Sequence, residues 1–468
     1  GNTTFVDGVL WMCAVHPEGD PVTDKAALYV KLYKETSNIL RGLSDVRQGI
    51  LLQATMGHGG FPGSATPWQL SVKPDGSSVY RMCPMDERFL DYMARTCRTF
   101  AAAKPDFFMV DDDTRLVFGD IPGCFCPLHL AEFSKRTKRK WTRQEVVSML
   151  KKGDSRDADV WKEVKVDSLR RFFRVIRKNF GDEIPGMLCV NNASFHRRYG
   201  KEYATILAAP GQTPILRGTG APYHDAERPK HVVGVRCSYA GQLDMVGSDI
   251  IYMQESDTCP HTLWATSAVR IYEYLVMLAL EGCKGAKIWI TRTGNYPEKK
   301  SANAYRRIFR ENRGIMEWAA KVDFRQEGIV VPACGPINLN FADRYLALTG
   351  IPYRFGKARK GEVTALTVET LKLLPRETVR EILGGIAIVA LAAFKRPRAR
   401  YPPCKIGMQK RITELRNTTF ENPFEQVVAS VIRPQSVAMS DEEAFPAQRQ
   451  RLVCVMYFYA ALLLQIVE

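Results

Sequence analysis

Residues 107–113 read Phe-Phe-Met-Val-Asp-Asp-Asp, and residues 250–257 read Ile-Ile-Tyr-Met-Gln-Glu-Ser-Asp. Each stretch is a short apolar run that ends in carboxylates, which is typical of a buried strand whose C-terminal end opens into a polar site. In a barrel of parallel strands, the carboxyl ends of all strands lie on one face. The two stretches therefore predict that acidic groups far apart in the sequence meet at one pocket.

Apolar runs alternate with amphipathic helical patterns as far as residue 325. The expected strands are 6–14, 49–55, 107–110, 187–190, 214–216, 250–253 and 286–290. The expected helices are 25–43, 87–103, 143–152, 159–179 and 265–281. Alternating strands and helices form parallel sheets, and seven or eight such units in about 320 residues favour a (β/α)8 TIM barrel. If the two acidic strands are the fourth and the seventh, the first strand is expected before Gly1.

A second unit is expected to begin after residue 325. We predict strands at 328–332, 351–355 and 386–391, and a helix at 341–348. A further helix is predicted to begin near Pro375, with an acid in its first turn, and to end at Gly384-Gly385. The resulting division is a catalytic barrel at 1–325, a small flavodoxin-like α/β domain at 326–393, and a basic C-terminal extension at 394–468 without an assigned fold.

The composition is that of an ordinary globular protein, with 46% apolar and 25% charged residues and a formal charge of +16. A basic surface can attract polyanions, but the chain has no arginine-rich motif interleaved with aromatic residues, so we expect no nucleic-acid partner. The apolar run 452–467 is shorter than the roughly 20 residues of a membrane helix, and we expect no membrane contact. The 12 cysteines suit buried thiols in a reducing, cytoplasmic compartment.

Two facing carboxylates are the minimal equipment for cleaving a glycosidic bond, and in retaining enzymes they lie about 5–5.5 Å apart. Like-charge repulsion within the Asp triplet would raise one pKa, which suits a general acid. Other interpretations stay open. The triplet also fits a helix cap or a cation site, such as the Asp-x-Asp of a metal-dependent glycosyltransferase built from Asp111 and Asp113. Glu255 also fits a cap of the helix after Pro260.

The order of several motifs carries a resemblance to a known family. Tyr80-Arg81-Met82-Cys83-Pro84 precedes the 107–113 strand, and Cys124-Phe125-Cys126-Pro127-Leu128-His129 follows it; later, Met253-Gln254-Glu255 precedes Leu263-Trp264-Ala265 and Gly285-Ala286-Lys287-Ile288-Trp289. In this order, residues 45–390 resemble the family 42 β-galactosidases and related β-galactosidase and β-mannosidase families of clan A of the glycoside hydrolases.

The resemblance implies a retaining exo-β-glycosidase that hydrolyses terminal β-galactosides or β-mannosides without an organic cofactor. Glu255 matches the family's nucleophile, Asp113 its acid/base, and Asp112 the Asn before that acid/base. The family has Glu at the acid/base position, so the shorter Asp113 requires a closer approach of its strand. The small domain looks like the family's trimerisation domain, which implies a homo-oligomer, a trimer as in the relatives. A non-catalytic carbohydrate-binding or assembly protein remains a further hypothesis.

Two more sets of residues are candidates for binding. Cys83, Cys124, Cys126 and His129 are ligands of the kinds that zinc prefers, and the resemblance implies a structural zinc here, with Cys in the family where His129 stands; the alternative is a set of buried thiols without metal. Polar residues at strand ends and two tryptophans that could stack on a sugar face are candidates for contacting an oligosaccharide or glycoside substrate. They are His58, Asp111, Asp112, Arg115, Asn191, Asn192, Arg217, Trp264 and Trp289.

Overall fold

The computed structural model describes residues 6–57, 66–118, 121–153, 155–190, 194–218, 242–243, 246–247, 249–257, 266–289, 305, 307–322, 327–332, 346, 351–357, 362–366, 374, 376–383 and 386–389. The chain divides into two compact units. The first comprises Gly1–Ala226 and Val246–Val322, and the second comprises Glu227–Met245 and Asp323–Glu468. Among the described residues, no helix is long and apolar enough to cross a membrane.

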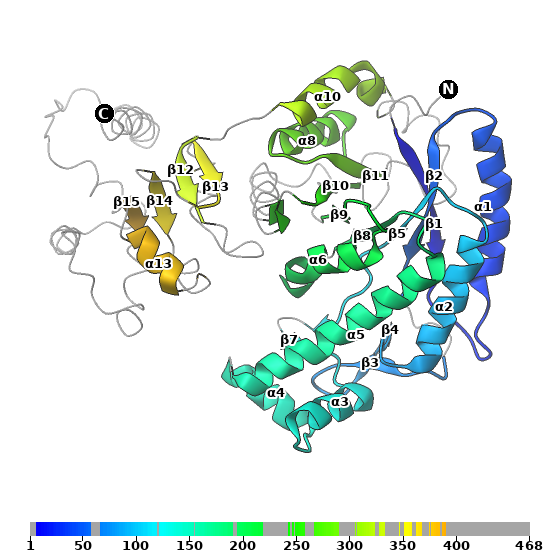
Figure 1. Cartoon of the computed structure of the whole chain (residues 1–468), viewed down its shortest axis with the longest axis vertical. Helices are drawn as coiled ribbons and strands as arrows, with labels where there is room; N and C mark the ends of the chain where they lie inside the picture. Colours follow the sequence, from blue (N-terminus) through cyan, green and yellow to red (C-terminus); the bar gives the residue numbers. More distant parts are fainter. Residues whose placement is uncertain are drawn as a thin grey trace, which may run out of the picture. The chain divides into compact units, whose positions relative to one another are not determined.

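The first unit is built on a curled, seven-stranded parallel sheet in the order β1-β2-β5-β8-β9-β10-β11 (Figure 1). The strands are β1 (Gly8–Ala14), β2 (Arg47–Gln53), β5 (Phe107–Val110), β8 (Gly186–Cys189), β9 (Ile215–Arg217), β10 (Ile251–Asp257) and β11 (Gly285–Trp289). All seven predicted strands are confirmed. Their order in the sheet is their order in the chain, which is consistent with a (β/α)8 barrel.

Helices connect these strands. They are α1 (Lys25–Arg41), α2 (Glu87–Ala101), α3 (Pro127–Thr137), α4 (Arg143–Lys152), α5 (Arg156–Phe180), α6 (Ser194–Leu207), α8 (Ala268–Leu280) and α10 (Arg313–Lys321). Several begin at a side chain that accepts a backbone N–H bond, as at Asp86 before α2 and Ser155 before α5. Thr142 and Glu145 form a reciprocal capping box at α4. The five predicted helices are confirmed; α3, α6 and α10 were not predicted.

The interior of the curled sheet is apolar at its middle level. Leu51, Met109 and Cys189 form a buried cluster there, with Leu10 and Met187 packed against it. Because side chains alternate along a strand, the intervening residues point to the helices. An apolar layer therefore lies beneath the C-terminal ends of the strands.

Two small hairpins lie in the connections at that end of the sheet. β3 (Leu70–Val72) pairs with β4 (Ser78–Met82), and β6 (Val117–Phe118) pairs with β7 (Ile121–Pro122), both antiparallel. The Phe125 N–H donates to the Val72 carbonyl, which joins the first hairpin to the segment after β7. These contacts bring the segment after β4 to the segment that follows β5.

The second unit contains a four-stranded parallel sheet in the order β13-β12-β14-β15. Its elements are β12 (Ile329–Val331), β13 (Tyr353–Phe355), β14 (Val363–Leu366), α13 (Arg376–Leu383) and β15 (Ile386–Val389). The predicted strands at β12, β13 and β15 and the helix at α13 are present, and β14 was not predicted. Apart from Leu346, the predicted helix 341–348 lies outside the described residues, as does the extension 394–468. A flavodoxin-like identity for this unit stays a prediction.

Candidate active site

Three adjacent strands place charged side chains on the inner face of the sheet. Glu255 on β10 is the register partner of Lys287 on β11, and Met253 on β10 is the partner of Arg217 on β9. Register partners in a parallel sheet point to the same face, as do residues two apart on one strand. Arg217, Glu255 and Lys287 therefore share one face at the C-terminal ends of their strands.

Arg217 is the centre of the charge cluster. Its Nη2 donates to Asp111 Oδ1 at 3.1 Å, and its Nη1 lies 3.1 Å from Glu255 Oε1 and 3.9 Å from Asp112 Oδ2. The side chain is only 2% exposed. Burial opposes its charge, but Cys189, Glu255 and Asp111 around it hold the pKa of Arg217 well above its usual range. The guanidinium is therefore a permanent cation that ties two distant chain segments together.

The predicted meeting of the two acidic stretches is present. Arg217 Nη1 lies 3.9 Å from Asp112 Oδ2 and 3.1 Å from Glu255 Oε1, so these two oxygens lie no more than about 7.0 Å apart. That upper limit for one pair of oxygens admits the roughly 5–5.5 Å between the carboxyl groups of retaining glycosidases.

Lys287 is a member of the site that sequence reasoning missed. Its Nζ lies 3.3 Å from Asp111 Oδ1, and both side chains are largely buried. Burial alone would disfavour the charge of Asp111, but Lys287 and Arg217 overcome it and lower the pKa of Asp111 to about 2. Asp111 is thus a fixed anion at every physiological pH. The signal available in the sequence was a lysine inside an otherwise apolar strand, two residues before Trp289.

Asp113 is the most deeply buried acid of the triplet. Its side chain is 1% exposed, its Oδ2 accepts the Ala54 N–H at 2.7 Å, and Arg115 Nη2 lies 3.9 Å from its Oδ1. Ala54 follows β2 with a left-handed φ of 51°. The carboxylate therefore holds the turn that leaves β2.

Asp112 is the most exposed acid of the three, at 16%. Arg115 Nη2 donates to its Oδ1 at 2.8 Å. Burial together with Asp111 and Asp113 raises the pKa of Asp112, against the opposing effect of Arg217 and Arg115. One carboxyl of the triplet is thus biased toward its protonated form, as like-charge repulsion predicts.

Of the other predicted substrate contacts, the structure describes Trp289. His58, Asn191, Asn192 and Trp264 lie outside the described residues. Trp289 ends β11 as the register partner of Asp257, on the face that carries Glu255. It is partly buried at the end of the sheet where the charged cluster lies.

Cys83, Cys124, Cys126 and His129 form a second cluster, with their ligand atoms all within 4.8 Å of one another and all four residues buried. The Cys83 and Cys126 sulfurs are 3.5 Å apart, and they lie 3.4 and 3.3 Å from His129 Nδ1. A tetrahedron with zinc bonds of about 2.0–2.3 Å has edges of about 3.3–3.8 Å. The residues present therefore fit a closed zinc site.

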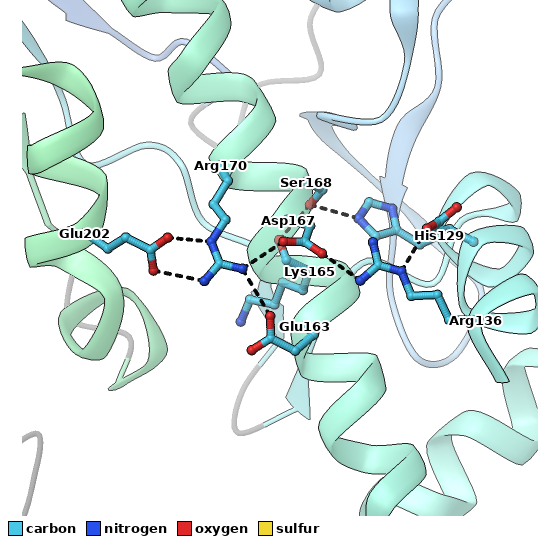
Figure 2. A network of polar contacts seen from close by, with 9 residues as sticks. His129, Arg136, Glu163, Lys165, Asp167, Ser168, Arg170 and Glu202 are labelled. Carbon is cyan, nitrogen blue, oxygen red and sulfur yellow. Dashed lines mark hydrogen bonds and ion pairs between the residues drawn. The ribbon is translucent and has the colours of Figure 1, made fainter.

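His129 is held in place from its other side. Its Nε2 lies 3.3 Å from Ser168 Oγ, which donates to the Lys165 carbonyl at 2.7 Å, as Figure 2 shows for the His129–Ser168 contact. A second hydrogen bond of this kind fixes the tautomer and orientation of a metal-binding imidazole. The cluster thus anchors the segment after β5 to helix α5.

A surface network surrounds this anchor (Figure 2). Arg170 on α5 binds Glu202 on α6 through two nitrogens, and its Nη1 also reaches Asp167 and Glu163. Arg136 on α3 binds Asp167 from the other side. Both Arg170 and Arg217 bind several carboxylates, but the Arg170 side chain is 22% exposed and that of Arg217 only 2%.

The sequence matches no family model, and no curated protein matches it. The structure is similar to α-L-fucosidase isoenzyme 2 from Paenibacillus thiaminolyticus, with a TM-score of 0.51 and 12% identity over 82% of this chain and 58% of that chain. The agarase AgWH50C matches with a TM-score of 0.36 and 11% identity, over 65% of this chain and 50% of the agarase, a score too low to carry an argument.

The chain thus spans little more than half the length of the fucosidase that it matches. At this identity the likeness shows the fold and not the substrate, and membership of family 42 stays a prediction. The comparison and the parallel sheet together show that the chain has a fold of the TIM-barrel kind.

Proposed function

We propose that the protein is a retaining glycoside hydrolase that uses Glu255 as nucleophile and a carboxyl of the 111–113 triplet as acid/base. The observation that carries the proposal is the shared guanidinium of Arg217, whose Nη1 brings Glu255 and Asp112 within about 7.0 Å of each other. By the family resemblance the acid/base would be Asp113.

The proposed reaction has two displacements. In the first, a Glu255 oxygen bonds to the anomeric carbon while the glycosidic C–O bond breaks, and the leaving oxygen takes the proton of the acid. In the second, the acid, now a carboxylate, removes a proton from water. The water oxygen bonds to the anomeric carbon as the bond to Glu255 breaks. Arg217 Nη1, 3.1 Å from Glu255 Oε1, orients the nucleophile for the first step.

The substrate proposed is a terminal β-galactoside or β-mannoside. An α-L-fucoside belongs in the same test, because the structural neighbour with the higher TM-score is named as an α-L-fucosidase. The proposal includes no organic cofactor, a structural zinc at Cys83, Cys124, Cys126 and His129, a homotrimer and a cytoplasmic location.

The glycosyltransferase alternative gains no support from the geometry. Asp111 Oδ1 already faces Arg217 and Lys287, whose positive charges would repel a divalent cation at the same oxygen. In the part of the chain that the structure describes, the metal-compatible cluster is the one at the cysteines and not at the triplet. A nucleotide sugar with a chelator control would still expose such an activity.

A panel of aryl β-galactosides, β-mannosides and α-L-fucosides tests the proposal. We expect turnover of one sugar and a loss of at least about 10³-fold in Glu255→Gln, as when one member of a catalytic set is removed. Glu317→Gln is the matched control, because Glu317 pairs with Arg313 on the exposed surface of α10. Equal turnover by Glu255→Gln and the wild type would refute the assignment. Binding of sugar without any turnover would favour a non-catalytic carbohydrate-binding protein.

A further inference from the structure

We propose that Asp112, rather than Asp113, is the acid/base of this site. The inference rests on the proposed glycosidase function and replaces the residue that the family resemblance selects. It follows from how each of the three aspartates is held.

Asp113 is hydrogen-bonded to the backbone at the end of β2. Its Oδ2 accepts the Ala54 N–H at 2.7 Å, and its side chain is 1% exposed. A proton donor must come within hydrogen-bond reach of the leaving oxygen. A carboxylate engaged by a strand-end amide and sealed from solvent is a structural clamp and does not meet that requirement.

Asp111 is excluded by its cations. Arg217 Nη2 and Lys287 Nζ both face its Oδ1, at 3.1 and 3.3 Å. Two buried cations on one oxygen keep the group ionised, so it cannot deliver a proton near neutral pH. Its carboxylate balances the positive charges of Arg217 and Lys287 beside Glu255.

Asp112 differs from both neighbours. It is the most exposed of the three, and its Oδ2 lies 3.9 Å from the Arg217 nitrogen that also contacts Glu255, longer than a hydrogen bond. Arg115 Nη2 donates to its Oδ1 at 2.8 Å, which orients the carboxyl. Asp112 Oδ2 and Glu255 Oε1 thus lie on the same Arg217 nitrogen, within about 7.0 Å of each other. The raised pKa of Asp112, caused by burial and the flanking acids, agrees with a group that rests protonated.

The chemistry then balances as follows. The Asp112 proton passes to the glycosidic oxygen as its bond to the anomeric carbon breaks and the Glu255 bond forms. The alcohol leaves, and the Asp112 carboxylate takes a proton from the incoming water, whose oxygen displaces Glu255. Asp112 ends protonated and Glu255 ends ionised, as both began.

The test compares Asp112→Ala with Asp113→Ala on a dinitrophenyl glycoside and on an unactivated phenyl glycoside of the sugar that the wild type hydrolyses. For Asp112→Ala we expect kcat/KM on the phenyl glycoside to fall by about 10²–10⁴-fold, and on the dinitrophenyl glycoside by less than about 10-fold. Azide should accelerate this variant and yield a glycosyl azide of retained configuration, because the anion displaces Glu255 from the anomeric carbon as a nucleophile and, unlike water, needs no base to remove a proton.

Asp113→Ala is expected to lose activity equally on both substrates, with lower thermal stability and without an azide product. If that variant does not fold, Asp112→Ala decides alone: a glycosyl azide supports the inference, and equal losses without azide product overturn it. A glycosyl azide from Asp113→Ala would also overturn it while leaving the glycosidase function intact. A wild type inactive on every glycoside would instead overturn the proposed function, and this inference with it.

Discussion

Replacing Arg217 by Met removes the buried cation that joins the two acidic segments. Arg217 lies 3.1 Å from both Asp111 and Glu255, and its side chain is 2% exposed. Removing one partner of a buried pair costs about 3–5 kcal/mol, because the remaining charge stays buried without compensation. Asp111 keeps Lys287 at 3.3 Å, whereas Glu255 loses the guanidinium. We therefore expect the free energy of unfolding in urea, measured at pH 7, to fall by about 3–5 kcal/mol.

The loss should depend on pH in a defined direction. The pKa of Asp111 is lowered from 3.8 to about 2 in the folded protein, and Lys287 and Arg217 lower it against burial. A depressed pKa contributes stability that is fully present above about pH 4 and disappears as the pH falls toward 2. Since Arg217→Met lacks part of this contribution, the difference between the unfolding free energies of the wild type and the variant should narrow, without closing, between pH 4 and pH 2.

Arg170→Met is the matched control. Arg170 binds three carboxylates, Glu202, Asp167 and Glu163, but 22% of its side chain is exposed. Ion pairs near the surface contribute about 0.2–1 kcal/mol each, so the loss of three should cost about 0.6–3 kcal/mol. If Arg217→Met costs no more than Arg170→Met, the reasoning about a buried central cation is refuted.

Three further predictions concern the rest of the first unit. One equivalent of zinc added to metal-free protein should raise the Tm by roughly 5 °C, because ligand binding stabilises the folded state by a few kcal/mol. Cys124→Ser should abolish the rise, whereas Cys97→Ser, at a buried cysteine outside the cluster, should not. A rise that survives Cys124→Ser would contradict the site. Gly49→Ala should lower the unfolding free energy by about 1–3 kcal/mol, because its Cβ would overlap the Phe107 ring. Gly314→Ala, in α10 with open space around its Cβ, should raise it by about 0.4–1 kcal/mol, and a loss of stability there would contradict the geometry.

The strands were predictable because each is an apolar run bounded by polar residues, as buried parallel strands are. Five helices were predictable from their amphipathic period. The hairpin β3–β4 was missed because its antiparallel strands are short and mix polar with apolar residues, so they carry no continuous apolar signal. The predicted helix that would follow the 328–332 strand cannot be compared, since it falls almost entirely outside the described residues.

The site was predictable only in outline. Carboxylates at the ends of apolar runs marked Glu255 and the triplet, because ionisable groups there cannot be part of the core. The importance of Lys287 depends on its register with Glu255, a relation between two strands that no single stretch of sequence contains. Which aspartate faces the nucleophile depends on the turn after β5, where strand alternation no longer applies.

Arg217, Glu255 and Lys287 lie on three neighbouring, hydrogen-bonded strands of one sheet. Their mutual spacing is set by the ladder between β9, β10 and β11, about 4.8 Å per step, and not by the connecting segments. Insertions or exchanges in the connections that follow those strands would leave the charged trio in position. In the proposed glycosidase, new connections could therefore be grafted to change the sugar that is bound while the three charged residues stay in place.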